Sequence, residues 1–224
     1  MSSRPMRVAG LRACSAHTQC RLARIRVRLL SLAIALLASS TAVAGLDHRL
    51  TYDNSGIWAR HYQEALEYGV IAVGVGGALW LGADDKLGKT FWQTIDASVA
   101  GALTVTAGKY IFGRERPSQT DDPHQWFKGS CCQSFPSGEI TLQQSFVTPF
   151  IVNYAGENPW VWGLEALPIY DAIARMKTWG HWQTDAIASI AIGATWGYLA
   201  TKRETPFFVE VLPKGISVGI HTRF

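Results

Sequence analysis

The sequence predicts an all-α protein, a helical bundle of about five core helices followed by a short C-terminal β-hairpin. Several mostly apolar segments run about fifteen residues without a charge, a length typical of helices and long for strands. Glycine, proline and acidic residues gather between these segments, where they mark loops. Alternation with a period of two residues occurs in the tail, which therefore gives the only strand prediction.

The first two predicted helices cover residues 63–83 and 91–112. The first contains five glycines in the uncharged stretch 69–83, which lower helix propensity but let neighbouring helices approach closely. We therefore expect this stretch to be buried against other helices or in lipid. The second helix is apolar over residues 97–108 and ends at Gly113, a typical helix stop.

Three more helices are predicted after a long loop at residues 113–137. They cover residues 138–155, with an interruption at Pro149, then residues 160–178 and residues 183–201. The tail from Pro206 alternates around a Pro-Lys-Gly turn and predicts the hairpin. The 113–137 loop is long for a compact domain, and loops of that length are usually functional.

The N-terminus has the pattern of a signal peptide. Residues 1–44 contain seven arginines and no acidic residue, an apolar run at 29–38, and a final Ala-Val-Ala before Gly45. We predict cleavage there, which leaves residues 45–224 as one domain in the periplasm or at the periplasmic face of the inner membrane. An uncleaved membrane anchor is the alternative interpretation.

The charge and cysteine content of the remaining chain exclude some functions. Removing seven leader arginines from the 21 basic residues leaves 14 against 17 acidic residues, so we expect no nucleic-acid partner. Cys131 and Cys132 are adjacent and form a vicinal disulfide, a link between chains or a small apolar patch. No second Cys/His pair is spaced to complete a tetrahedral metal site, so no metal is expected.

Three groups of polar residues flank the long loop. The first runs from Lys109 to Arg116-Pro117, and the second is Pro-Ser-Gly-Glu at residues 136–139. The third places Arg175 six residues before His181, and Asp185 four residues after it. If the segment after Gly180 is helical, the last two side chains share one face, where a carboxylate can orient an imidazole.

This arrangement resembles the three-part signature of the type 2 phosphatidic acid phosphatase and vanadium haloperoxidase superfamily. The order, the internal spacings and the separations all agree with it. Three positions depart from the family pattern: Glu139 replaces a histidine, Ala174 replaces a serine, and Trp182 replaces a smaller residue. The first departure falls on a catalytic position.

The resemblance implies a role for each matching residue in phosphoryl transfer. His181 attacks phosphorus and forms a phosphohistidine, while Asp185 orients its ring and stabilises the imidazolium. The phosphate oxygens are bound by three cations, by a hydroxyl and by the first backbone N–H of a helix, with no cofactor required. These groups belong to Lys109, Arg116, Arg175, Ser137 and Gly138. We expect Arg114 and Lys128, which match no motif position, to be solvated charges.

Glu139 stands where the family's histidine protonates the leaving group. A glutamic acid can do this if burial raises its pKa, and we expect such an enzyme to have an acidic pH optimum. The alternative is that Glu139 caps the helix or pairs with an arginine.

The function expected from the resemblance is hydrolysis of a phosphate monoester or diphosphate, with a phosphorylated lipid as the expected substrate. Candidate substrates are phosphatidate, undecaprenyl diphosphate and a lipid A phosphate. Tryptophans near several helix ends suit the interfacial belt of a membrane-associated protein, and they equally suit a soluble core. The alternatives are a non-catalytic phosphate-binding pseudoenzyme and a vanadate-dependent haloperoxidase. The sequence leaves the exact ester and the oligomeric state open.

Overall fold

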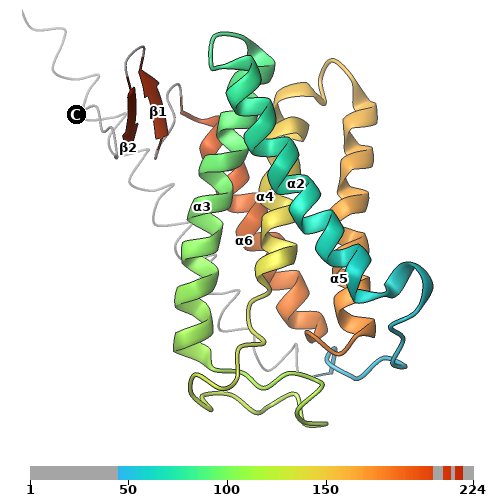
Figure 1. The fold of residues 1–224 in the computed structure, drawn as a ribbon. Coiled ribbons are helices and arrows are strands. Elements are labelled where there is room, and N and C mark those ends of the chain that lie inside the picture. Colours follow the sequence, from blue (N-terminus) through green and yellow to red (C-terminus); the bar gives the residue numbers. More distant parts are fainter. Residues whose placement is uncertain (1–44, 204–208, 213–214, 219–224) are drawn as a thin grey trace, which may run out of the picture. The chain divides into compact units, whose positions relative to one another are not determined.

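The computed structural model describes residues 45–203, 209–212 and 215–218. The predicted signal peptide, residues 1–44, lies outside the described residues. The described part is a bundle of α-helices, which confirms the predicted all-α fold (Figure 1). In chain order the elements are η2 (Gly56–Trp58), α2 (Arg60–Leu81), α3 (Lys86–Phe112), α4 (Gly138–Tyr154), η3 (Pro159–Glu165), α5 (Ala166–Lys177), α6 (Gln183–Thr201), β1 (Val209–Leu212) and β2 (Gly215–Val218).

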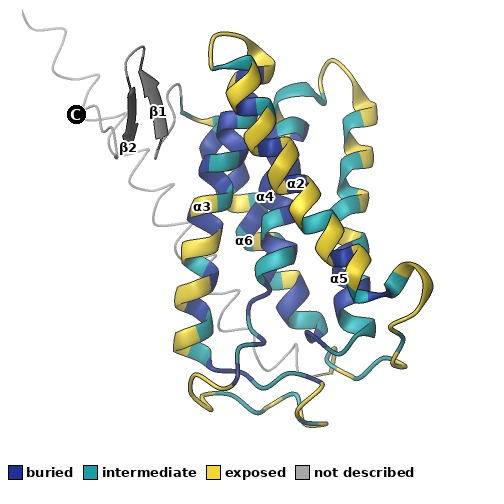
Figure 2. Cartoon of the chain, in the orientation of Figure 1, coloured by how far each residue is buried: buried dark blue, intermediate teal, exposed yellow. Residues whose placement is uncertain are grey.

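Helix α4 is the centre of the bundle and packs against α2, α3, α5 and α6. After Glu139 it has no charged residue, and most of its side chains are buried (Figure 2). A helix that is apolar or uncharged all round belongs in a core. Its residues Phe146, Val147 and Ile151 form the main apolar cluster together with Val70 of α2.

Two helix boundaries differ from the sequence-based prediction. Helix α3 begins at Lys86, five residues earlier than predicted, because the Asp85 side chain accepts a hydrogen bond from the Gly88 N–H at 2.6 Å and caps the helix. The predicted interruption of α4 at Pro149 is wrong, since α4 continues to Tyr154. Pro149 lies directly against Gly197 of α6, and this packing offsets the lost backbone hydrogen bond.

The predicted helix at residues 160–178 is two elements. Asn158 caps the backbone N–H of Trp160, and Pro159 starts the 3-10 helix η3. Helix α5 then begins at Ala166, with Pro168 in its first turn, where the missing N–H of proline costs no helical bond. The prediction for α6, residues 183–201, agrees with the structure.

Helix α2 is buried along one narrow stripe. Its four buried residues are Gln63, Val70, Gly74 and Ala78, while Leu79 is 63% exposed and Trp80 is 89% exposed. Gly77 permits one close approach, since a Cβ there would lie 2.7 Å from the Phe91 ring. The expected burial against other helices is therefore limited to this stripe. Among the described helices, α2 has the length and apolar composition needed to cross a membrane.

The C-terminal strands form the predicted hairpin. Strand β1 pairs with β2 in the antiparallel direction, with Val209 opposite Val218 and Leu212 opposite Gly215.

One end of the helical bundle collects the three sequence motifs. It contains the C-terminal ends of α3 and α5, the N-terminal ends of α2, α4 and α6, and the long loop between α3 and α4 (Figure 1). Residues far apart in the sequence are thereby brought to one place.

Candidate active site

His181 is buried and lies in the short connection between α5 and α6. Its Nδ1 atom donates a hydrogen bond to the carbonyl oxygen of Ser134 at 2.6 Å. A carbonyl oxygen only accepts, so Nδ1 carries the proton and Nε2 keeps its lone pair. Burial lowers the pKa of His181 to about 4. The ring is therefore neutral above that pH and has a free basic nitrogen.

The structure orients this ring differently from the prediction. Helix α6 begins at Gln183, so His181 precedes the helix that carries Asp185. The Asp185 Oδ2 atom lies 3.7 Å from Nδ1, which is too far for a hydrogen bond. The carboxylate instead holds the residue that contacts the ring, because the Ser134 hydroxyl donates to Asp185 at 2.5 Å.

Asp185 is completely buried and well supplied with donors. Besides Ser134, it accepts hydrogen bonds from Arg114 Nη1 at 2.5 Å and from the backbone N–H of Trp182 at 2.9 Å. Burial alone raises the pKa of Asp185, but the contacts with His181, Arg114 and Ser134 outweigh it and hold the pKa below the ordinary value. A buried aspartate is thus kept ionised beside the imidazole.

Arg114 is the main residue that the sequence analysis missed. We expected a solvated charge, but its side chain is 1% exposed. It pairs with Asp185 and with Asp47 at 2.6 Å, and its guanidinium lies 4.3 Å from the centre of the Trp126 ring. Its acidic partners are about 70 residues away in the sequence in opposite directions, so no local spacing signals this role. Lys128 is exposed, as expected.

Trp182, one of the departures from the family pattern, directly follows His181 in the chain. Its side chain is completely buried, and its indole N–H donates to the carbonyl oxygen of Glu115 at 2.8 Å. This bond ties the start of α6 to the loop after α3. Gly180 leaves room for the Arg175 side chain, because a Cβ at this position would lie 2.6 Å from Nη2 of Arg175. A side chain at this position would displace the arginine.

The predicted phosphate ligands lie around the same end of the bundle. Lys109 is half-buried, and its pKa is lowered by burial and by the nearby charge of Arg116. Arg175 is buried and also acts electrostatically on Lys109 and on His181. The cations are thus concentrated close to the neutral imidazole, which favours an anionic ligand.

Ser137 and Gly138 form the start of α4. The Ser137 backbone N–H donates to the Ser189 hydroxyl at 2.7 Å. The Ser137 hydroxyl is completely buried and has no hydrogen-bond partner within the described residues. Gly138 is the first residue of the helix, where backbone N–H groups have no intrahelical acceptor. Free donors of this kind are suited to a phosphate oxygen.

Glu139 forms a two-bond ion pair with Arg60, a residue of α2 outside the motifs. Arg60 Nη1 lies 2.5 Å from Oε2, Arg60 Nη2 lies 2.8 Å from Oε1, and Arg175 Nε lies 3.7 Å from Oε2. Burial alone raises the pKa of Glu139, but the Arg60 bond and the charges of Arg175 and Arg60 outweigh it, so the pKa is lowered. The expected raised pKa is therefore wrong, and the alternative, a pair with an arginine, is confirmed.

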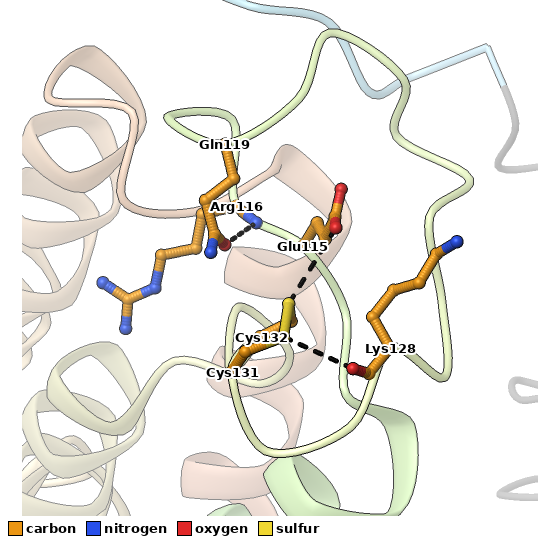
Figure 3. Close-up of a disulfide and its surroundings, with 6 residues drawn as sticks. All are labelled: Glu115, Arg116, Gln119, Lys128, Cys131 and Cys132. Carbon is orange, nitrogen blue, oxygen red and sulfur yellow. Dashed lines mark hydrogen bonds between the residues drawn. A yellow bond between two sulfur atoms is a disulfide. The ribbon is translucent and has the colours of Figure 1, made fainter.

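The adjacent cysteines form a vicinal disulfide in the loop that precedes Ser134 (Figure 3). Cys132 Sγ lies 3.9 Å from the carboxylate of Glu115. The Arg116 guanidinium extends away from the disulfide, and its backbone N–H is held by the Gln119 side chain at 2.9 Å. Among the alternatives left open by the sequence, the structure contains the disulfide within one chain.

Parts of this chain are similar to known proteins. A family model described as the PAP2 superfamily matches residues 93–206, which is half of the chain. The lipid A 1-phosphatase of Porphyromonas gingivalis is 32% identical over 97 residues, or 42% of this chain and 19% of that protein. The chain therefore spans about a fifth of this curated relative. The crystal structure of Aquifex aeolicus LpxE aligns with a TM-score of 0.49 and 17% identity, over 64% of this chain and 85% of that chain.

Proposed function

The chain belongs to the PAP2 superfamily, and from this premise we propose that it is a metal-independent phosphatase that hydrolyses a phosphate monoester or diphosphate. The observation that carries the proposal is the state of His181. Its Nδ1 proton is committed to Ser134, and its pKa is about 4, so Nε2 is an available nucleophile at neutral and mildly acidic pH.

The proposed reaction begins with binding of the phosphate group among the cations. Lys109, Arg116 and Arg175 neutralise its oxygens. The Ser137 hydroxyl, which has no partner among the described residues, and the Gly138 N–H donate to them. Except for Arg116, which lies in the loop after α3, these groups lie at helix ends and are in place before substrate arrives. Little reorganisation is needed as charge develops on the transferring phosphoryl group.

His181 Nε2 then attacks phosphorus and the bond to the leaving oxygen breaks, which gives a phosphohistidine. The imidazole gains positive charge in this step. Asp185, ionised and held by Arg114, stabilises that charge at a distance of 3.7 Å. Water attacks the phosphohistidine in the second step and releases phosphate.

Glu139 is proposed to lie on the path of the proton that the leaving oxygen needs. It occupies the matching motif position and contacts Arg175, a proposed phosphate ligand. In the free protein it is ionised by its pair with Arg60. Phosphate binding competes with Glu139 for these arginines, which raises the tendency of Glu139 to take up a proton.

A lipid phosphate is the proposed substrate class. The curated relative is a lipid A 1-phosphatase, and α2 has a long exposed apolar face that begins at the site end of the bundle. An apolar face of this kind is suited to contact with lipid. We place the mature domain, residues 45–224, in the periplasm or at the periplasmic face of the inner membrane, and we propose residues 1–44 as its signal peptide.

A second candidate is a non-catalytic phosphate-binding protein. The Arg60–Glu139 pair favours it, because a carboxylate fixed by an arginine is a poor proton donor. This candidate predicts phosphate or vanadate binding without turnover.

The test is release of inorganic phosphate from lipid phosphates and soluble esters, in the presence of a chelator, between pH 4 and pH 8. The wild type is compared with His181→Ala and with His124→Ala, which removes an exposed histidine of the loop. We expect release by the wild type and by the His124 variant, and none by the His181 variant. Phosphate binding without release from any substrate would support the second candidate.

A further inference from the structure

Three helices carry a polar layer between the candidate site and the apolar core. At the site, Gln63, Glu139 and Arg175 contact one another or share Arg60 as a partner. Deeper in the bundle, Val70, Phe146 and Leu167 belong to one apolar cluster. One residue on each helix lies between these two levels, four residues from the site residue and three or four residues from the apolar residue: Glu67 on α2, Gln143 on α4 and Asp171 on α5.

This polar layer contains buried atoms without partners. Asp171 and Gln143 are both completely buried. Neither oxygen of Asp171 and neither amide atom of Gln143 has a hydrogen-bond partner within the described residues. Almost all buried polar groups in proteins are paired, so four such atoms in one layer require a physical explanation. A buried, ionised carboxylate without a donor is especially costly.

The charges around Asp171 come from all three helices. Glu139 on α4 and Glu67 on α2 disfavour its ionisation, whereas Arg175 on its own helix and Arg60 on α2 favour it. Burial is the largest effect, and together these effects raise the pKa of Asp171 to about 7. Asp171 is thus a neutral carboxylic acid in mildly acidic solution, one helical turn from Arg175.

We propose that Asp171 stores the proton for the leaving group and acts through Glu139. The inference rests on the proposed phosphatase function. It assigns the proton of the leaving group to Asp171, a residue outside the three motifs, because Arg60 holds Glu139 ionised. Asp171 does not touch the substrate in this account. Its role is to return a proton to Glu139.

The proton balance closes over the two steps. In the first, the Nε2–phosphorus bond forms and the bond to the leaving oxygen breaks. Glu139, a carboxylate in the free protein, takes the proton of Asp171, which becomes a carboxylate, and passes a proton on to the leaving oxygen. In the second, water forms the new phosphorus–oxygen bond and the Nε2–phosphorus bond breaks. The proton lost by water returns through Glu139 to Asp171.

Leaving-group dependence tests this role. An alkoxide must be protonated to leave, whereas p-nitrophenolate leaves as a stable anion. We expect Asp171→Asn to reduce kcat for a monoalkyl phosphate by about 100-fold and kcat for p-nitrophenyl phosphate by less than about threefold. We also expect the variant to lose the decline in alkyl phosphate turnover that the wild type shows above about pH 7.

Asp96→Asn is the matched control. Asp96 is a buried aspartate of α3, about 20 Å along that helix from Lys109. We expect this variant to hydrolyse both esters at the wild-type rate per folded molecule.

Two results would overturn the proposal. One is an equal loss for both esters in Asp171→Asn, which indicates a structural role. The other is wild-type turnover of the alkyl ester by that variant. If the wild type and His181→Ala are equally inactive on both esters, the phosphatase function itself fails, and the role of Asp171 fails with it.

Infrared difference spectroscopy gives a readout that does not depend on activity. A protonated carboxyl band at pH 6 that is present in the wild type and absent in Asp171→Asn is expected. Its absence from the wild type would contradict the proposal.

Discussion

The two sides of the candidate site differ in how their carboxylates are held. On the nucleophile side, Asp185 is completely buried and receives three hydrogen bonds from separate donors. On the leaving-group side, Glu139 is paired with Arg60 near the surface, and Asp171 beneath it has no partner among the described residues. The comparison shows that the carboxylate beside the proposed nucleophile is held by buried hydrogen bonds, while the position proposed for the acid departs from the family pattern.

Removing Arg114 is expected to have the largest effect, because Arg114 is the cation that pairs with both Asp185 and Asp47. In Arg114→Met, Asp185 and Asp47 remain as buried carboxylates without their cation. We expect unfolding free energy to fall by about 3–5 kcal/mol and phosphatase activity to fall about 100-fold. Chemical denaturation and steady-state kinetics measure the two losses.

Arg49→Met is the control for Arg114→Met, since Arg49 pairs with the highly exposed Asp121 and lies over Trp179. A loss of less than about 1 kcal/mol is expected there. Similar behaviour of the two arginine variants would show that the buried network has no special role.

The pH dependence of kcat/KM distinguishes the ionisation of His181 from that of Asp171. The nucleophile must be unprotonated, so activity rises with pH as His181 loses its proton near pH 4. The stored proton must be present, so activity falls as pH rises through about 7, where Asp171 ionises. We expect a bell-shaped profile with an acidic optimum, measured with an alkyl phosphate.

The phosphate group of the substrate also ionises near pH 6 and shapes the profile. Because the wild type and Asp171→Asn are measured with the same ester, this ionisation affects both profiles equally and cancels in their comparison. A wild-type acidic limb near pH 6.5, the ordinary value for histidine, would contradict the buried neutral His181.

Breaking the Arg60–Glu139 ion pair tests the proposed proton path to the leaving group. In Arg60→Met, Glu139 loses the hydrogen bond that most lowers its pKa, so its pKa rises. We expect a smaller change in activity, about tenfold. The alkaline limb should move to higher pH, because the charge of Arg60 also lowers the pKa of Asp171, whose ionisation sets that limb. Exchange of Arg60 for lysine keeps the charge and is expected to restore most of the wild-type profile. An unchanged limb in Arg60→Met would exclude the coupling.

The smallest effect is expected at Trp182. Trp182→Phe keeps most of the buried ring but removes the hydrogen bond to the Glu115 carbonyl. We expect a loss of about 1 kcal/mol in unfolding free energy and little change in kcat. A large loss of kcat with normal stability would place Trp182 in the reaction itself.

The sequence predicted most of the fold because its helices carry clear signals. The end of α3 at Gly113 and the range of α6 follow from apolar runs with distinct stops. The break predicted at Pro149 was wrong because the low helix propensity of proline does not take account of the α6 surface that packs against Pro149. The split between η3 and α5 depends on local capping by Asn158, which periodicity does not detect.

The candidate site was only partly predictable. The motif residues could be named because their spacing is local, but Arg60, Arg114 and Asp171 could not. Arg60 meets Glu139 across 79 residues, and Arg114 meets Asp185 across 71. The proposed role of Asp171 depends on its burial and on the lack of a hydrogen-bond partner among the described residues, an environment that forms only after α2, α4 and α5 pack together. These contacts also explain why the predicted pKa of Glu139 had the wrong direction.

The stereochemical course at phosphorus tests the central claim most directly. A phosphorothioate monoester, in which sulfur replaces one phosphoryl oxygen and two different oxygen isotopes label the other two, is hydrolysed by the wild type in water of the third isotope. The configuration of the released thiophosphate is then determined. Two successive in-line displacements, first by His181 and then by water, each invert the centre, so the account predicts overall retention. Overall inversion would mean direct attack by water, and it would contradict a phosphohistidine at His181.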